Sequence, residues 1–574
     1  MAIRAVLDFV IFCSRHPLGT GAVLLALWLI LRRRTDGHAA DHAAAWSRVR
    51  PALAVLAAIV CLAFLSTSLW YLNHDGYASD VEAMVSSVSW WVQTGGPLYH
   101  APDADPQYSV LYGPAVYLAT GLCLDLLHPS IFAAKLGALL ALYASVVLLF
   151  LTIRRLVSGA LAFGMTAIAL LLYWTGGTSA MLVRPDPYIL TAVCLGLYAA
   201  GASRRVPAVV GAALALGLAV NLKVHAVLYL LPVLTLLDER HGSRATRAAL
   251  ALGAVAVVAP FALHDGISLI NYLSWLLIGA RHGLELDYLP HLFTRALFFA
   301  VPVLVLLSAS GRPAHRPWMR RQLVLAWAAG NAAVIVLAMK PGAGQVHLLP
   351  MIPINLVFAA RLWPAEGMRG LLFPERGASW RLGAVSAFLA AALVAGSVSG
   401  YRSARLASSR MENSTAISAD IRGILAEHPG RAIGMGYSGD SNYFHLANLR
   451  PLLTFSGNPL LIDAVSLMDS RRAHREIPEA TLAALDAGVI DLWLVPRGRQ
   501  PFRLANWYPP HDDVFSDEVR ARFSTHYRLE GHSRYFDLWG WDQSAALDGV
   551  LAQAGAGSAV AALSARTTGT GLHD

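Results

Sequence analysis

The chain has 574 residues, of which 56% are hydrophobic and only 14% are charged, and its formal net charge is +9. Soluble domains carry about 25% charged residues, so the composition excludes a soluble globular protein and indicates an integral membrane protein. The positive charge does not indicate a nucleic-acid partner, because the basic residues lie in short loops between apolar runs. All four cysteines lie in apolar runs, which excludes a disulfide framework or a zinc site in the C-terminal region.

Apolar runs of about 20 residues recur from the N-terminus to about Gly400, and each is long enough to cross a hydrocarbon core about 30 Å thick. Arginine-rich short loops separate many of these runs, and cytoplasmic loops collect such residues. Placing those loops in the cytoplasm gives a consistent orientation with about 12 spans. The predicted spans cover residues 17–31, 52–72, 130–152, 158–175, 184–202, 206–221, 223–237, 248–265, 291–310, 323–339, 346–361 and 383–400.

One further apolar stretch, residues 110–127, does not fit this orientation as a span. A crossing there would place Arg154 and Arg155 outside, so we predict a helix that lies along the membrane interface. The outer face then carries the region from Tyr401 onward and five loops, over residues 73–107, 175–184, 221–223, 265–291 and 340–347.

Carboxylates gather in the first outer loop, directly after the span 52–72. Charged groups at the edge of a bilayer are costly to place, so Asp75, Asp80 and Glu82 are functional candidates. The pattern predicts a helix over residues 77–92 that Asp75 opens, with Asp75 and Glu82 on one face and Asp80 turned away. The alternative is that Asp75 only caps this helix and that the other two carboxylates are solvated.

The order of three short motifs carries a family resemblance. The motifs are Asp75-Gly76-Tyr77, Gly96-Pro97-Leu98-Tyr99 and Tyr112-Gly113-Pro114. Over residues 52–360 the chain resembles the GT-C superfamily of membrane glycosyltransferases, which includes protein O-mannosyltransferases and lipid A aminoarabinose transferases. The resemblance implies transfer from a polyprenyl-phosphate sugar on the extracytoplasmic face, with inversion at the anomeric centre. Many relatives carry two adjacent acids where this chain has His74-Asp75, which leaves the base role open between Asp75 and Asp80.

Further ionisable residues lie at the outer ends of later spans. Arg184 and Asp186 open one span, and two such groups at membrane depth predict the lining of a cavity. A plain helix start, with proline and an acid in the first turn, is the alternative. Asn221, Lys223 and His225 lie at the apex of a predicted helical hairpin, where Lys223 either serves the site or only extends to the interface.

A glycine-rich segment, Lys340 to His347, enters another span from the outer side. Its backbone N–H groups suit a phosphate, and the two terminal residues add charge. It is not a nucleotide-binding P-loop, because it lacks the Gly-Lys-Ser/Thr sequence and faces the wrong side for ATP. Arg281 lies in another outer loop and is predicted to bind or support the acceptor.

Transfer of a sugar to a hydroxyl needs a carboxylate that takes the acceptor proton and cations that stabilise the departing phosphate. A divalent cation would assist, but no ligand spacing requires one, and no metal ligands are predicted. The predicted site comprises Asp75, Asp80 and Asp186 as catalytic residues, Arg184, Lys223, Lys340 and His347 for the donor phosphate, and Glu82, Tyr112, His225 and Arg281 for the acceptor or as support.

After residue 400 the chain becomes mixed and polar. Strand patterns occur at residues 432–437, 489–495 and 535–541, and helix patterns at 480–485 and 516–527. The aromatic segment 506–515 is a candidate carbohydrate contact, although ordinary packing explains it nearly as well. The predicted domains are an N-terminal span with a cytoplasmic loop (1–51), a GT-C-like transmembrane catalytic domain (52–400), an extracytoplasmic α/β domain (401–545) and a disordered tail (546–574).

The sequence therefore predicts a polytopic α-helical membrane protein, GT-C-like, with a C-terminal extracytoplasmic α/β domain. The expected function is transfer of a sugar from a polyprenyl-phosphate donor to a lipid, glycan or protein acceptor, at the outer side of a bacterial inner (plasma) membrane. A secondary transporter or lipid flippase is the alternative. Transporters place ionisable residues near the midplane and often contain repeats, whereas here the charges cluster at span ends on one side.

Overall fold

A computed structural model of the protein describes residues 2–32, 39–109, 112–309, 317–363, 379–439, 444–508 and 511–542. The predicted disordered tail, 546–574, lies outside the described residues. The helices of the N-terminal two thirds are α1 (Ala2–Arg15), α2 (Pro17–Arg32), α3 (Ala39–Leu72), α4 (Asp80–Gln93), α5 (Pro114–Leu127), α6 (Ile131–Arg154), α7 (Gly159–Trp174), α8 (Pro185–Ala200), α9 (Arg205–Leu222), η1 (Val224–Leu230), α10 (Leu231–His241), α11 (Ser243–Leu263), α12 (Leu269–Ala280), η2 (Leu286–Tyr288), α13 (Leu289–Ala309), α14 (Pro317–Ala338), η3 (Gly344–Leu348), α15 (Met351–Leu362) and α17 (Ser379–Arg410).

Eight helical segments in the described ranges are long and apolar enough to cross a membrane, and a ninth span results if the pair α1–α2, bent by 104°, counts as one. Three more of the predicted spans correspond to shorter helical segments, namely α7, α8 and the η1–α10 pair. The stretch predicted to lie along the interface contains helix α5, which at 14 residues is shorter than a spanning helix.

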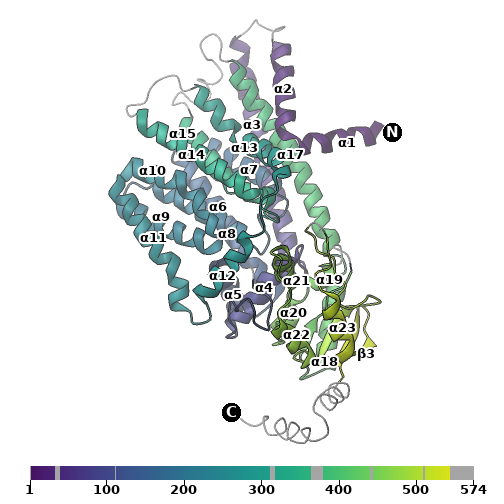
Figure 1. Ribbon diagram of the computed structural model, residues 1–574. Coiled ribbons are helices and arrows are strands. Elements are labelled where there is room, and N and C mark those ends of the chain that lie inside the picture. Colours follow the sequence, from purple (N-terminus) through teal and green to yellow (C-terminus); the bar gives the residue numbers. More distant parts are fainter. Residues whose placement is uncertain are drawn as a thin grey trace, which may run out of the picture.

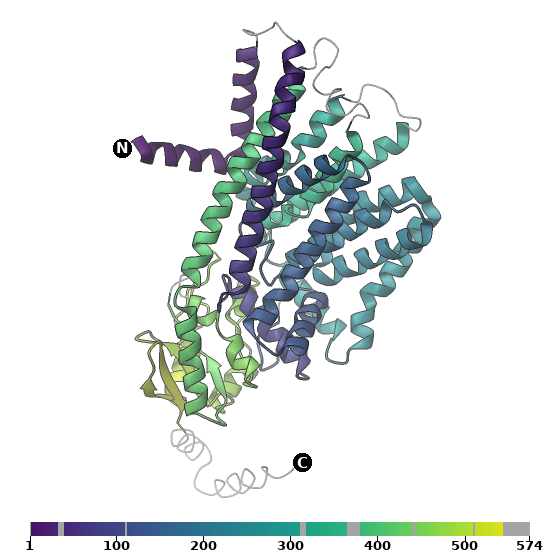
Figure 2. The ribbon, with the colours of Figure 1, turned by 180° about the vertical axis from the view of Figure 1, so that it is seen from behind.

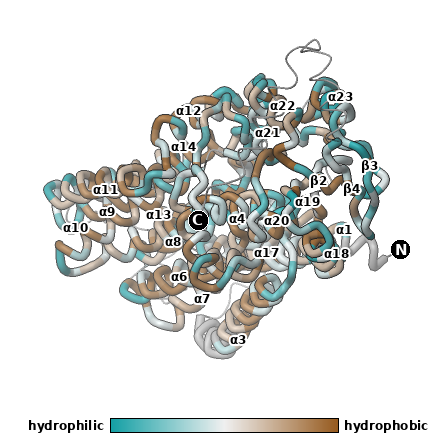
Figure 3. Tube along the Cα trace, turned by 90° about the horizontal axis from the view of Figure 1, so that it is seen from below, coloured by the Kyte–Doolittle hydropathy of each residue, from teal (hydrophilic) through white to brown (hydrophobic). Residues whose placement is uncertain are grey.

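The helices form a packed block with the C-terminal domain at one end (Figure 1). Helices α6, α8, α9 and α11 pack in succession, and α17 packs against α2, α7 and α13. Helix α17 leads from this block into the C-terminal domain, which lies beside α4 (Figures 1 and 2). Hydrophobic residues dominate α6, α7 and α8, whereas β3 and α23 are mostly hydrophilic (Figure 3). The amphiphilic division predicted from the sequence is therefore present.

The helix in the first outer loop begins later than predicted. Ser79 is its N-cap, and Ser79 and Glu82 form a capping box in which each side chain bonds to the other residue's backbone. The prediction that Asp75 opens this helix is wrong, since Asp75 lies exposed, outside the helix. The idea that Asp80 and Glu82 are solvated is also wrong, because both side chains are buried.

The C-terminal domain contains a four-stranded sheet of order β1-β2-β4-β3. Strands β1 and β2 pair in parallel, and the other two pairs are antiparallel. Its elements are α18 (Ser414–Glu427), β1 (Ile433–Met435), α19 (Phe444–Ala447), α20 (Pro451–Phe455), α21 (Ala464–Arg472), α22 (Glu479–Asp486), β2 (Leu492–Pro496), α23 (Asp517–His526), β3 (Tyr527–His532) and β4 (Phe536–Trp541). The three predicted strands and two predicted helices are confirmed to within a few residues. Strand β3 was missed because it is an edge strand with a bulge and mostly exposed side chains, and so lacks an alternating pattern.

A buried arginine joins this domain to the first outer loop. Arg450 Nε donates to Asp463 Oδ2 over 2.7 Å, and Arg450 Nη2 donates to the backbone oxygen of Asp80 over 3.0 Å. Backbone bonds reinforce the contact, because Gln107 N donates to Leu461 O and Asp463 N donates to Gln107 O. The first residues of α4 are therefore fixed by the C-terminal domain.

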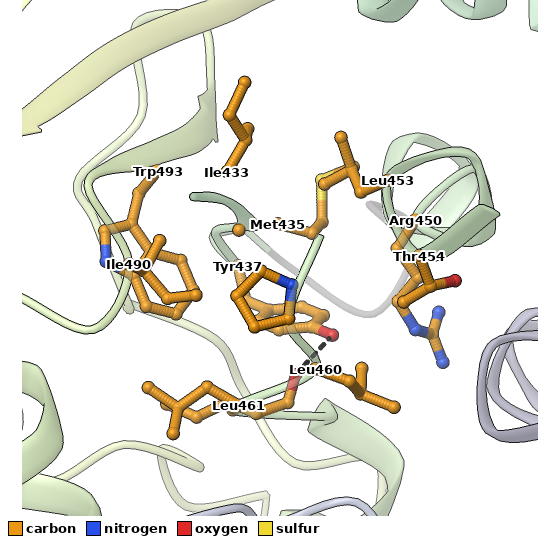
Figure 4. Close-up of a pocket in the computed structure, with 13 residues that line it drawn as sticks. Ile433, Met435, Tyr437, Arg450, Leu453, Thr454, Leu460, Leu461, Ile490 and Trp493 are labelled. Carbon is orange, nitrogen blue, oxygen red and sulfur yellow. Dashed lines mark hydrogen bonds between the residues drawn. The ribbon is translucent and has the colours of Figure 1, made fainter. Parts of the chain in front are cut away.

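The interior next to this arginine is tightly filled. A small pocket of about 20 Å³ lies here and is lined mainly by apolar residues. The Arg450 guanidinium points away from them (Figure 4). The Tyr437 hydroxyl donates to Ile462 O at the edge of this pocket.

We expect Arg450→Ala to be much more destabilising than Arg431→Ala. Arg450 and Asp463 are almost fully buried, whereas Arg431 pairs with Glu530 at a site where both side chains are about a third exposed. Removing one partner of a buried pair costs about 3–5 kcal/mol, and an exposed pair contributes about 0–1 kcal/mol. Thermal unfolding in detergent, followed by tryptophan fluorescence, measures the difference. Equal melting temperatures for the two variants would contradict the structural role of Arg450.

Candidate active site

A cavity of about 640 Å³ lies where the C-terminal domain meets the helical block. Its wall comes from the start of α4, the turn before α5, the residues that precede α8 and η1, the loop between α14 and η3, and residues of α21 and of the segment 507–508. Of the residues predicted for the site, the structure places Asp80, Tyr112, Arg184, Lys223, His225, Lys340 and His347 in this wall.

The cationic part of the wall is held by Asp186, which lies behind it. The Lys223 ammonium donates to Asp186 Oδ1 over 3.2 Å, and Arg184 Nε lies 3.2 Å from Asp186 Oδ2. Arg184 and Lys223 line the cavity, but Asp186 is buried and does not belong to its wall. The catalytic role of Asp186 stays a prediction, and the structure places this carboxylate behind the cations and outside the cavity wall. Its geometry is that of an anchor for two cations.

A close backbone approach places Tyr112 beside these cations. Gly113 N donates to Leu222 O, and a Cβ on Gly113 would lie 2.2 Å from the backbone oxygen of Asn221. Only glycine permits this contact. The preceding residue is Tyr112, whose ring centroid lies 5.3 Å from Lys223 Nζ. The motif that carried the family resemblance thus lies directly against the end of α9.

Histidines and a third cation complete this side of the cavity. The rings of His225 and His347 stack with their centroids 4.8 Å apart. His347 Nδ1 lies 3.1 Å from Ala343 O, which fixes the ring against the loop that begins at Lys340. Lys340 lines the cavity on this loop. The structure thus brings the predicted phosphate-binding residues into one place.

Asp80 is the carboxylate of the first outer loop that lies in the cavity. Ser79 Oγ donates to Asp80 Oδ1 over 3.2 Å, and no described residue bonds to Asp80 Oδ2. Burial raises the pKa of Asp80, and the nearby guanidinium of Arg450 partly opposes this effect. A buried carboxylate oxygen without a partner is costly, so a hydrogen bond from a ligand hydroxyl would stabilise it.

The other two carboxylates of this loop lie elsewhere. Asp75 is exposed and outside the cavity wall. Glu82 is fully buried and accepts bonds from Tyr71 Oη and from the backbone nitrogens of Ala78, Ser79 and Val183. The bonds to Glu82 hold the loop and the start of α4 together. Of Asp75 and Asp80, only Asp80 lines the cavity.

The C-terminal domain adds residues that were not predicted. Asp469, on α21, lines the cavity and accepts a bond from the Tyr508 hydroxyl over 3.2 Å. Burial raises the pKa of Asp469 to about 6, against the opposing charge of Lys340. Trp507 and Tyr508 belong to the aromatic segment singled out in the sequence. No signal in the sequence marks Asp469, because it stands in an ordinary short polar helix.

Two basic residues at the outer ends of the helices lie outside the cavity wall. Arg281 is exposed and does not line the cavity, whereas its neighbour His282 is buried in the wall. Lys135 donates to the backbone oxygens of Tyr71 and His74 and so stabilises the end of α3. Within the described ranges, no group of three or more His, Cys, Asp or Glu side chains is arranged to hold a metal ion.

Comparison with known proteins gives structural matches only. No family model matches the chain, and no curated protein matches it. The structure of ArnT from Cupriavidus metallidurans bound to undecaprenyl phosphate matches with a TM-score of 0.50 at 14% identity, over 87% of this chain and 99% of that one. The apo structure of the same protein gives a TM-score of 0.48 at 15% identity, over 88% and 99% of the two chains. An Archaeoglobus fulgidus oligosaccharyltransferase tethered with an acceptor peptide gives 0.44 at 10% identity, over 85% and 74%.

At 14% identity and a TM-score of 0.50, the match to undecaprenyl-phosphate-bound ArnT shows a shared fold. It covers 87% of this chain and 99% of the matched chain. The fold that the sequence motifs suggested is therefore confirmed: the protein is an α-helical membrane protein with the GT-C fold and a small C-terminal α/β domain.

Proposed function

We propose that the protein is a membrane glycosyltransferase that moves a sugar from a polyprenyl-phosphate donor to an acceptor hydroxyl. The observation that carries this proposal is the cavity itself, in which Arg184, Lys223 and Lys340 share one wall with the unpaired carboxylate oxygen of Asp80. Cations for a leaving phosphate and a base for an acceptor hydroxyl are the two kinds of group that this reaction needs.

The cationic side suits the donor phosphate. Arg184 presents a guanidinium and Lys223 an ammonium, and Asp186 fixes both from behind. Such preorganised charges stabilise a phosphate that gains negative charge as its bond to the sugar breaks. The binding of undecaprenyl phosphate by ArnT, which shares the fold, supports a polyprenyl carrier.

Asp80 takes the role of general base. Its Oδ2 accepts the proton of the acceptor hydroxyl while the hydroxyl oxygen attacks the anomeric carbon. The phosphate then leaves from the opposite face of that carbon, so the product has inverted configuration. Direct displacement needs one base and one stabilised leaving group, and the cavity contains both.

The proposed location follows from the loops. Arginine-rich loops face the cytoplasm under the positive-inside rule, which places the cavity and the C-terminal domain on the extracytoplasmic side. We propose the plasma membrane of a bacterium as the site of action. The alternative, a transporter or flippase, would move the donor across the membrane without forming a glycosidic bond.

We expect Asp80→Asn to reduce sugar transfer by about 10²- to 10⁴-fold, the usual contribution of a general base. The amide cannot take the hydroxyl proton, but it keeps the size of the side chain. Asp75→Asn, in the same loop but exposed, is the matched control and should keep near wild-type transfer. Transfer from labelled polyprenyl-phosphate sugars is measured with purified protein in liposomes. Full activity of the Asp80 variant, or a wild type that only translocates donor, would refute the proposal.

We also expect transfer to be lost as the pH falls. The base must be deprotonated, and burial raises the pKa of Asp80, so the acid limb of kcat/KM should lie above the ordinary aspartate pKa of about 3.9. A pH profile of kcat/KM for the wild type tests this. An acid limb at or below the ordinary aspartate pKa would contradict the role of Asp80 as the base.

A further inference from the structure

One wall of the cavity has no role in the transfer as described so far. It comes from the C-terminal domain and consists of Asp469, Trp507 and Tyr508. Its residues are a carboxylate and two aromatic rings, and a carboxylate repels a donor phosphate. The cations lie on the wall that the helical block supplies. The two walls therefore suit ligands of different chemistry.

The geometry of this wall is fixed from several sides. The Tyr508 hydroxyl donates to Asp469 Oδ1, and the backbone oxygen of Asp469 lies 2.9 Å from His282 Nε2. The rings of Trp507 and Tyr508 meet nearly edge to face, with centroids 5.9 Å apart and an angle of 85°. These contacts hold the carboxylate and the rings in place before any ligand binds.

The loop opposite this wall lies very close to it, as the surroundings of Gly342 show. Gly342 has a φ of +77°, and a Cβ there would lie 2.5 Å from the Tyr508 hydroxyl. The loop that carries Lys340 thus passes directly against the ring. Asp469 also lies within electrostatic reach of both Lys340 and Asp80. The aromatic wall and the proposed base therefore belong to the same cavity.

A carboxylate accepts hydrogen bonds and, when ionised, donates none, so its ligand must supply donors. Aromatic rings offer flat apolar faces, and ligand pockets typically combine such faces with a few well-placed polar groups. A sugar meets both demands, because its hydroxyls donate and its C–H faces are apolar.

We propose that Asp469, Trp507 and Tyr508 form an acceptor subsite and that the acceptor is a carbohydrate. This inference rests on the proposed function. A sugar ring of the acceptor packs on the aromatic pair and donates a hydroxyl to Asp469, which brings a second hydroxyl to Asp80. That hydroxyl oxygen bonds to the anomeric carbon of the donor and its proton passes to Asp80. The bond from the anomeric carbon to the phosphate oxygen breaks, and polyprenyl phosphate leaves with the electron pair.

A peptide or a sugar-free lipid fits this wall less well. Extended peptides are commonly bound along an open sheet edge, but the edge strands β1 and β3 contribute no residue to the cavity wall within the described chain. A lipid tail offers no donor to Asp469 and would leave a buried carboxylate without a ligand bond. The second experiment below distinguishes peptide and lipid acceptors from carbohydrate acceptors.

The first experiment measures acceptor and donor kinetics separately. Trp507→Ala and Asp469→Asn should each raise the KM for acceptor about tenfold, equivalent to about 1.4 kcal/mol, with the KM for donor unchanged. Trp507→Phe keeps an aromatic face and should recover most of the loss. Asp512→Asn changes an exposed carboxylate of the same domain outside the cavity and is the matched control. Equal effects on donor and acceptor KM would assign these residues a merely structural role and overturn the proposal.

The second experiment identifies the acceptor class. Purified full-length protein and tritiated polyprenyl-phosphate sugars are incubated with a pool of cell-envelope oligosaccharides, with a Ser/Thr peptide library and with diacylglycerol. Label on the oligosaccharides supports the proposal. Label on peptide or diacylglycerol, or donor hydrolysis without transfer to the oligosaccharides, overturns it. If wild type consumes no more donor than Asp80→Asn, the proposed transferase function itself fails.

Discussion

The site depends on the guanidinium of Arg450. A buried cation is tolerated only when its charge and its N–H donors are matched, and Arg450 finds these partners in Asp463, the Ala447 carbonyl and the Asp80 carbonyl. The last bond crosses from the C-terminal domain to the first turn of α4. Asp80 accepts this bond with its backbone oxygen, and its side chain is the proposed base. The position of the base is therefore set by a domain more than 300 residues away in sequence.

The same turn of α4 also fixes the cationic wall. Glu82 lies two residues after Asp80 and accepts a bond from the backbone nitrogen of Val183, the residue directly before Arg184. A buried glutamate with four donors around it is rigid. The start of α4 therefore positions the proposed base and, through Val183, the neighbouring Arg184. Asp186 pairs with both Arg184 and Lys223 and so fixes the second cation relative to the first.

Much of the fold could be predicted because hydropathy and charge determine it locally: apolar length predicts spans, and alternation predicts strands such as β2 and β4. The start of α4 could also have been read from the sequence, since Ser79 and Glu82 have the spacing of a capping box. That spacing favours Asp80 as the first helical residue and separates it from Asp75. The place of Asp469 could not be predicted, because its presence in the cavity results from domain docking through Arg450 and Gln107, and no local pattern encodes such contacts.

The two walls of the cavity differ in charge, and this difference bears on which substrate binds against which wall. The cations come from the helical block, whereas Asp469 and the aromatic pair come from the C-terminal domain. If the proposed function holds, the negative charge of Asp469 opposes a reversed binding mode in which the donor phosphate lies against it. The choice of which molecule gives the sugar and which receives it would then follow from electrostatics, with Asp80 in the wall of the same cavity.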